Sequence, residues 1–422
     1  MMKRSSLILL LCWVVALASA QQEAPHPTLE QLGSIYYAYP TPSGRLTSAP
    51  AGYEPCYISH YGRHGSRWLT ADSRYSVIIQ LFDSLSAIHQ LTPFGEEIRQ
   101  RLYRVWEDAK GCSGNITPLG EQQHRQIADR MYRRFPQVFS GRAVVDARSS
   151  TSLRCAMSMS YFTERLKEYN PSLQISRRPY TRYMSYIAYT SPEGEAFSSE
   201  SADWRKGAFQ AFEQRKVRPA RLLSSLFTRP EAFNEKQADD LARSFYWLAA
   251  DMQNVNLPGM SFYDLFTYDE LYGIWQTVNA RMYVCNANAP QAEDIMTRCA
   301  IPLLRNIMES ADSALTRPGQ PVAHLRFGHD THLIRLLALM GIEGCALPET
   351  DMEKFHLAWQ DYRVSPMAAN LQLVFFRNKQ QPDDILVYLL HNEEEATLPI
   401  PAAQGPYYRW KDVKEFWLKK CQ

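Results

Sequence analysis

The sequence has no marked excess of charge of either sign. Its 422 residues include 46 basic and 44 acidic side chains, and charged residues make up 21% of the chain. A nucleic-acid-binding protein usually carries a broad basic face, so this balance disfavours that class of function. The hydrophobic share of 45% argues against an intrinsically disordered chain and is enough for a large buried core.

Long apolar runs are also missing, except for one at the start of the chain. Leu7–Ala18 follows Lys3 and Arg4 and precedes small residues that end at Ala20. A spanning helix needs about 20 apolar residues, so this shorter run is typical of a cleaved secretory signal. We therefore expect residues 1–20 to be removed and the protein to be secreted or periplasmic, without stable membrane insertion.

Several motifs of other enzyme classes are absent. The sequence holds no GxSxG, HExxH or CxxC pattern, which argues against serine hydrolases, zinc peptidases and CxxC metal or redox sites. His324, His329 and His332 lie close together in the sequence, but no carboxylate pattern accompanies them. We therefore predict neither a metal nor a cofactor.

Cysteine is present eight times, once in the predicted signal as Cys12. An exported chain can form disulfides, but the seven remaining cysteines are an odd number, so at least one is unpaired or pairs between chains. Cys285 and Cys299 enclose the shortest loop and are the predicted pair. The seven are Cys56, Cys112, Cys155, Cys285, Cys299, Cys345 and Cys421.

What the chain does contain is an alternation of β-prone and amphipathic helical segments, which predicts an α/β fold. Thr117 and Pro118 suit the cap and first position of a helix, and Gly341 suits a helix end. The aromatic-rich region of about residues 180–310 predicts a mainly helical insertion. The predicted strands are Cys56–His60, Ala143–Val145, Val322–Phe327, Asn370–Arg377 and Asp384–His391, and the predicted helices include Arg74–Ala87, one from Pro118, one with Arg154 in its first turn, and Thr331–Met340.

Three charged clusters each stand where a predicted strand gives way to a helix. They are Arg63–Arg67, Ser149–Arg154 and His329–Thr331. In open α/β sheets, ligands bind at the carboxyl ends of strands, where helix N-termini favour anions. Three arginines and two histidines at such positions predict a phosphate site.

The first cluster contains a predicted nucleophile and two arginines that are predicted to bind phosphate. Arginine donates paired hydrogen bonds and keeps its charge, so Arg63 and Arg67, with Arg154, are predicted to bind the phosphate oxygens. His64 is the predicted nucleophile, because the adjacent arginines disfavour its charged form. Gly65 is predicted to let the ester approach the backbone closely.

The third cluster supplies the acid. Asp330 is predicted to protonate the leaving oxygen, and His329 to bind the phosphate beside it. An aspartic acid is protonated mainly at low pH, so we expect an acidic optimum. Thr331, the next residue, is a further candidate for the site.

Four motifs together resemble those of a known family. In order and spacing, "RHGSR", "ITPLGEQQH", "SSTSLRCAMS" and "GHDTH" are similar to the motifs of the histidine acid phosphatases, the branch of the histidine phosphatase superfamily that contains phytases and multiple inositol polyphosphate phosphatases. The resemblance implies a phosphoglycerate-mutase-like, three-layer α/β/α core with a mainly helical inserted cap. The core would cover about residues 50–70, 116–175 and 315–422, and the cap about residues 71–115 and 176–314.

The resemblance also implies roles for single residues and a substrate. The matching residues are the nucleophile His64, the acid Asp330, and a phosphate clamp of Arg63, Arg67, Arg154 and His329. Inositol polyphosphate phosphatases commonly carry histidine-alanine-glutamate at the second site, whereas here Asp330 directly follows His329. A phytate-like substrate is therefore a hypothesis from resemblance, helped slightly by the basic residues Arg177, Arg178 and Arg182.

Other functions stay open at this point. A non-specific acid phosphatase acting on sugar or small organic phosphates would use the same residues. A catalytically silent protein that binds phosphate esters would need the arginines alone, so the presence of both His64 and Asp330 disfavours it. His124, on the helix after Pro118, is most simply a surface residue, and the sequence does not indicate an oligomeric state.

Overall fold

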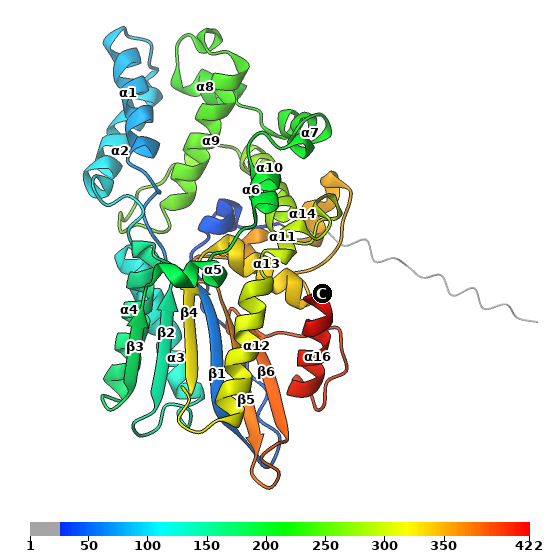
Figure 1. Ribbon diagram of the computed structural model, residues 1–422. Coiled ribbons are helices and arrows are strands. Elements are labelled where there is room, and N and C mark those ends of the chain that lie inside the picture. Colours follow the sequence, from blue (N-terminus) through cyan, green and yellow to red (C-terminus); the bar gives the residue numbers. More distant parts are fainter. Residues whose placement is uncertain (1–25) are drawn as a thin grey trace, which may run out of the picture.

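An eight-stranded sheet organises the chain (Figure 1). The computed structural model describes residues 26–422, so the predicted signal segment 1–20 lies outside the described residues. The strand order is β3-β2-β4-β1-β5-β6-β7, with β8 paired to β6. The strands are β1 Tyr53–Arg63, β2 Val144–Ser149, β3 Gln174–Arg178, β4 Ala323–Gly328, β5 Asn370–Asn378, β6 Ile385–His391, β7 Glu394–Glu395 and β8 Tyr407–Arg409.

Sixteen α-helices are found in the described part of the chain, and a short 3-10 helix, η1 Gln31–Tyr36, precedes β1. They are α1 Ser73–Ala87, α2 Pro93–Ala109, α3 Pro118–Arg134, α4 Leu153–Tyr169, α5 Met184–Ile187, α6 Pro192–Ser198, α7 Ala208–Lys216, α8 Ala220–Leu226, α9 Glu235–Asp251, α10 Tyr268–Asn286, α11 Ile295–Arg298, α12 Ile301–Thr316, α13 Asp330–Met340, α14 Phe355–Ala358, α15 Asp361–Val364 and α16 Trp410–Lys420.

Helices cover both faces of the sheet, as side-chain alternation on the strands requires. On β1, Ile58 packs with Met131 of α3 and Phe162 of α4 in one core. The neighbouring Tyr57 belongs to the other core, which contains Leu304 of α12. Figure 1 shows α12 and α16 beside the sheet. The three-layer α/β/α prediction is confirmed.

Most other helices lie beyond the carboxyl ends of the strands (Figure 1). There, α1, α2, α8 and α9 share a separate apolar core that includes Phe82, Ile98, Leu226 and Phe245. Between β3 and β4 the named elements are helical, which confirms the helical insertion expected there. The exact limits of core and cap stay a prediction.

Local sequence patterns correctly predicted one helix start and one helix end. The Thr117 hydroxyl accepts a hydrogen bond from the Gly120 N–H at the start of α3, and Gly341 ends α13 with a φ of 73°. Strand β1 is longer than predicted and ends at Arg63. Strand β4 spans Ala323–Gly328 and so lies one residue later at each end than the predicted Val322–Phe327.

The prediction that His124 is a surface residue is wrong. Its side chain is buried, and its ring centroid lies 5.8 Å from that of Phe327 on β4. The reason is that α3 turns Gln123, His124 and Ile127 toward the sheet.

The predicted Cys285–Cys299 disulfide is also wrong. All seven cysteines within residues 26–422 carry free thiols. The Cys299 Sγ atom donates to the carbonyl oxygen of Ile295 and accepts a hydrogen bond from the N–H of Ser191, so it is engaged elsewhere. The pair was predicted from sequence separation alone, which carries no information on where the two cysteine side chains point.

None of the helices described in residues 26–422 has both the length and the hydropathy needed to cross a membrane.

Candidate active site

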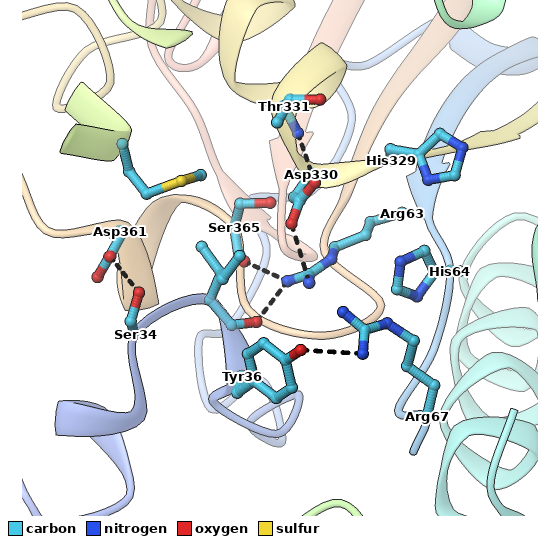
Figure 2. Close-up of polar contacts among 12 residues, drawn as sticks. Ser34, Tyr36, Arg63, His64, Arg67, His329, Asp330, Thr331, Asp361 and Ser365 are labelled. Carbon is cyan, nitrogen blue, oxygen red and sulfur yellow. Dashed lines mark hydrogen bonds and ion pairs between the residues drawn. The ribbon is translucent and has the colours of Figure 1, made fainter. Parts of the chain in front are cut away.

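The register of the parallel strands brings the three charged clusters to one edge of the sheet. Arg63 at the end of β1 pairs with Gly328 at the end of β4, and Ser149 at the end of β2 pairs with Phe327. The segment after each strand therefore emerges at the same place. Figure 2 shows side chains of the first and third clusters converging there.

His64 lies at the centre of this edge with its side chain buried. Its Nδ1 atom is 2.9 Å from the carbonyl oxygen of Gly65. A carbonyl can only accept, so Nδ1 carries the proton and Nε2 keeps its lone pair. Burial, followed by the charges of Arg63 and Arg67, lowers the pKa of His64 well below its ordinary value. The imidazole is therefore neutral and has a nucleophilic nitrogen available.

Arg63 is fully buried and held on one side by carbonyl groups. Its Nη1 atom donates to the carbonyl oxygens of Ile35 and Ser365, at 2.6 and 2.8 Å. Its Nη2 atom lies 3.1 Å from the Asp330 carboxylate (Figure 2). These contacts leave the Nε–H group unused.

Arg67 and Arg154 complete a group of three guanidinium side chains. The Arg67 Nη1 atom donates to the Tyr36 hydroxyl and to the carbonyl oxygen of Trp68, both at 3.0 Å. The buried Nε atoms of Arg63, Arg67 and Arg154 have no hydrogen-bond partner among the described residues. Buried donors in this state are costly unless a ligand satisfies them.

The third cluster lies next to His64. The ring centroids of His64 and His329 are 5.8 Å apart, and the His329 Nε2 atom is 3.2 Å from the Ser150 hydroxyl. Burial, followed by Arg154, lowers the pKa of His329 to about 4. The Asp330 carboxylate accepts from the Thr331 N–H at 2.8 Å, so Thr331 contacts it through the backbone.

The charges of the site suit a dianion. Three arginines face one carboxylate, Asp330, while both histidines have lowered pKa values and are neutral. Two positive charges are therefore in excess, which matches a phosphate monoester. Within residues 26–422, no group of three or more His, Cys, Asp or Glu side chains is arranged to hold a metal ion.

Gly65 has a different reason for being glycine than the predicted approach of the ester. A Cβ atom added there would lie 2.6 Å from the carbonyl oxygen of Gly120. A Cβ atom on Gly120 would in turn lie 2.2 Å from the carbonyl oxygen of Ser66. The two glycines let the start of α3 pack directly on the loop that carries His64.

Several residues that the sequence did not single out hold this loop. Gln123 of α3 accepts from the Ser66 N–H at 2.8 Å, and the Ser158 hydroxyl accepts from the Gly65 N–H at 3.2 Å. The Ser66 hydroxyl donates to Asn254 at 2.7 Å. Gln123 stands inside a recognised motif, but no local signal marks Asn254, which lies after α9.

A family model supports what this geometry indicates. The model described as the histidine phosphatase superfamily (branch 2) matches residues 62–392. The chain belongs to this family. The predicted family and the predicted enzyme class, a phosphatase of the histidine type, are thereby confirmed.

Two relatives align in sequence with most of this histidine phosphatase. It is 24% identical over 379 residues to the Multiple inositol polyphosphate phosphatase 1 of Gallus gallus, covering 84% of this chain and 79% of that protein. It is also 24% identical over 353 residues to the Homo sapiens protein of that name, covering 76% of this chain and 68% of the other.

Solved structures share the fold. The Multiple Inositol Polyphosphate Phosphatase of Bifidobacterium longum, in complex with inositol hexasulfate, superposes with a TM-score of 0.79 at 18% identity, covering 93% of this chain and 98% of that one. The phytase from D. castellii gives a TM-score of 0.66 at 16% identity, covering 96% and 88%. At these identities the likeness confirms the fold class alone.

Proposed function

We propose that the protein is an exported phosphomonoesterase that hydrolyses inositol polyphosphates through a phosphohistidine intermediate. The observation that carries the proposal is the set of three buried, unpartnered Nε–H groups around His64, on Arg63, Arg67 and Arg154. Tetrahedral phosphate oxygens would satisfy these donors and bring phosphorus next to the histidine.

The first chemical step forms a bond between phosphorus and His64 Nε2 and breaks the bond to the ester oxygen. Asp330 gives its proton to that oxygen, so the alcohol leaves neutral. In the second step water attacks the phosphohistidine, and the Asp330 carboxylate takes the proton of the water. Inorganic phosphate leaves, and His64 and Asp330 return to their starting states.

The substrate class is supported by relatives. Two of them are named as inositol polyphosphate phosphatases, and a structural neighbour was solved with inositol hexasulfate. Because Asp330 directly follows His329, a non-specific acid phosphatase is the alternative function. An assay on both kinds of substrate must distinguish it from an inositol polyphosphate phosphatase.

Export is proposed from the first twenty residues alone, because Lys3, Arg4 and the apolar run Leu7–Ala18 have the composition of a secretory signal. Mass spectrometry of the protein recovered outside the cytoplasm should give an N-terminus at Gln21. A mature protein that begins at Met1 would contradict export by this route.

Phosphate release from an aryl phosphate and from inositol hexakisphosphate tests the reaction. We expect His64→Ala to lower activity by at least about 10⁴-fold, as removal of a catalytic nucleophile does. A chelator should leave the wild-type rate unchanged, because the proposed steps use protein groups alone. His26→Ala, at an exposed position, is the matched control and should behave as the wild type.

Three outcomes would count against the proposal. Undiminished activity in His64→Ala would exclude the nucleophile, and loss of activity in the chelator would exclude the metal-free steps. A rate on small organic phosphates that equals or exceeds the rate on inositol hexakisphosphate would replace the proposed substrate class with a non-specific acid phosphatase.

A further inference from the structure

Tyr36 contacts the candidate site from outside the segment that carries the family motifs. It ends η1 and lies well ahead of residues 62–392, which match the family model. Its side chain is buried. In Figure 2 its ring stands beside Arg67, and a dashed line joins its hydroxyl to the guanidinium.

The contacts between Tyr36 and Arg67 are of two kinds. The Tyr36 hydroxyl accepts a hydrogen bond from Arg67 Nη1 at 3.0 Å, and the Arg67 Cζ atom lies 4.8 Å from the centroid of the tyrosine ring. A second acceptor, the carbonyl oxygen of Trp68, binds the same Nη1 atom at 3.0 Å. Both hydrogens of Nη1 are therefore engaged by the protein.

This arrangement decides which edge of the guanidinium is free. The group is planar, and its N–H donors form a fixed fork. With Nη1 engaged, the edge formed by Nε and Nη2 remains, and the Nε atom of Arg67 has no partner among the described residues. That edge presents two parallel N–H groups, which suit two oxygens of one phosphate.

Tyr36 is itself fixed by groups other than Arg67. Its ring centroid lies 5.1 Å from that of Trp247 on α9. Its carbonyl oxygen accepts from the Asn254 Nδ2 atom at 2.8 Å, and the same Asn254 accepts from the Ser66 hydroxyl. A tyrosine held at both ring and backbone can orient a more flexible arginine.

We propose that Tyr36 is a positioning residue of the phosphate site, which turns the Nε–Nη2 edge of Arg67 toward the bound phosphate. The inference rests on the proposed function in that the ligand is a phosphate group. It adds a residue that lies outside the motifs of the family. Its effect on binding is exerted entirely through Arg67.

The test is Tyr36→Phe, which removes the hydroxyl acceptor and keeps the ring over Arg67 and against Trp247. We expect the dissociation constant for inorganic phosphate, measured by titration calorimetry, to rise about tenfold, in line with the loss of a hydrogen bond to a charged group. The value of kcat/KM should fall by a similar factor. The melting temperature should stay close to that of the control variant.

Tyr246→Phe is the matched control. Tyr246 is buried, and its hydroxyl donates to the carbonyl oxygen of Leu32 at 2.6 Å, so it holds the same segment η1 without any hydrogen bond to Arg67. This variant should lose stability at least as much as Tyr36→Phe and bind phosphate as the wild type does.

The results separate this inference from the proposed function. Unchanged phosphate affinity in Tyr36→Phe, or an equal loss in Tyr246→Phe, would overturn the positioning role even if the enzyme is a phosphatase. Phosphate binding that depends on Tyr36 in a wild type without turnover would support the positioning role and overturn the proposed function. A wild type that does not bind phosphate would overturn both.

Discussion

Asp330 stands in an environment that opposes its proposed role as an acid in the free protein. Burial raises its pKa, but the Arg63 guanidinium and the Thr331 N–H together hold the pKa below its ordinary value. A carboxyl in this state is ionised over most of the pH range. A bound phosphate dianion pairs with Arg63 and adds negative charge beside Asp330, and both effects raise the pKa. We therefore expect Asp330 to become protonated, as the proposed donor must be, mainly in the complex with substrate.

This electrostatic coupling predicts two different pH profiles. The kcat profile reports the substrate complex, and the kcat/KM profile reports the free enzyme. We expect the alkaline limb of kcat to lie at higher pH than the alkaline limb of kcat/KM, with an acidic optimum for both. Coincident limbs would show that substrate does not change the pKa of Asp330.

Asp330→Asn provides a separate check on the acid. It should lower kcat on alkyl phosphates by roughly 10²–10³-fold, within the usual range for general acid catalysis, and remove the alkaline limb. The effect should be smaller on aryl phosphates, whose leaving groups need less protonation. Asp383→Asn, at an exposed position, should leave both profiles unchanged. Equal losses on both kinds of substrate would argue against proton donation by Asp330.

At the scale of elements, the contact between α3 and the loop after β1 fixes the position of the proposed nucleophile, His64. Gly65 and Gly120 allow the two backbones to touch, and Gln123 of the same helix binds the loop through Ser66. The His64 carbonyl oxygen accepts from the Ala368 N–H at 3.0 Å, so the loop is held on the opposite side as well. A side chain at either glycine would have to move the loop or the helix.

Gly65→Ala and Gly120→Ala should therefore damage both stability and activity. Insertion of a methyl group into packed backbone typically costs about 1–3 kcal/mol, which corresponds to a lower melting temperature by several degrees. Displacement of His64 should lower kcat at least about tenfold. Thermal melting and steady-state kinetics measure the two effects.

Gly44→Ala is the control for this pair. A Cβ atom at Gly44 would have its nearest neighbour at 3.9 Å, a side-chain atom of Glu394. This variant should melt and turn over as the wild type does. If Gly65→Ala does the same, the close approach to Gly120 is not required.

At the scale of the whole molecule, two buried carboxyl groups make stability depend on pH. Burial raises the pKa of Asp251 to about 7 and that of Asp361 to about 6, from an ordinary value of 3.8. Arg67 opposes the shift at Asp251, and the Ser34 hydroxyl opposes it at Asp361. Both groups hold protons in the native state at pH values where the unfolded chain has lost them.

These two carboxyl groups therefore contribute a part of the free energy of unfolding that falls as pH rises from about 4 to about 7, because the native state holds their protons and the unfolded state does not. Buried histidines with lowered pKa values, such as His64 and His329, contribute in the opposite direction, so the aspartate contribution is measured as the difference between variant and wild type. Each pKa unit corresponds to about 1.4 kcal/mol, so a contribution of a few kcal/mol is expected from the two aspartates. Denaturant titrations across this range measure it. Relative to the wild type, Asp251→Asn and Asp361→Asn should each gain stability as pH rises over this range, and the exposed Asp383→Asn should not. A stability difference between variant and wild type that does not change with pH over this range would contradict the raised pKa values.

The free thiols give a second prediction for the whole molecule. All seven cysteines within residues 26–422 are unpaired, although the protein is proposed to be exported. Alkylation after denaturation without reductant should therefore label seven thiols, and a reductant should not change the melting temperature. The same labelling after reduction is the control. Fewer labelled thiols before reduction than after it would reveal a disulfide.

Short-range sequence patterns were enough to predict most helices and strands and to single out the candidate residues of the site. The cap at Thr117 and the helix end at Gly341 depend on neighbours within one turn, so local chemistry predicts them. The same holds for the four motifs, whose residues are adjacent in the chain. The predicted disulfide between Cys285 and Cys299 failed because its basis was distance along the chain.

The sequence by itself determined the α/β class, the family, and Arg63, His64, Arg67, Arg154, His329 and Asp330 as candidates, because each depends on local residue types and their order. Only the tertiary structure decided that β1 and β4 end side by side, that His124 is buried, and that Tyr36 and Asn254 brace the loop. These features arise from contacts between residues far apart in the chain. Packing of the sheet and of α9 sets such contacts, and no neighbouring residue signals them.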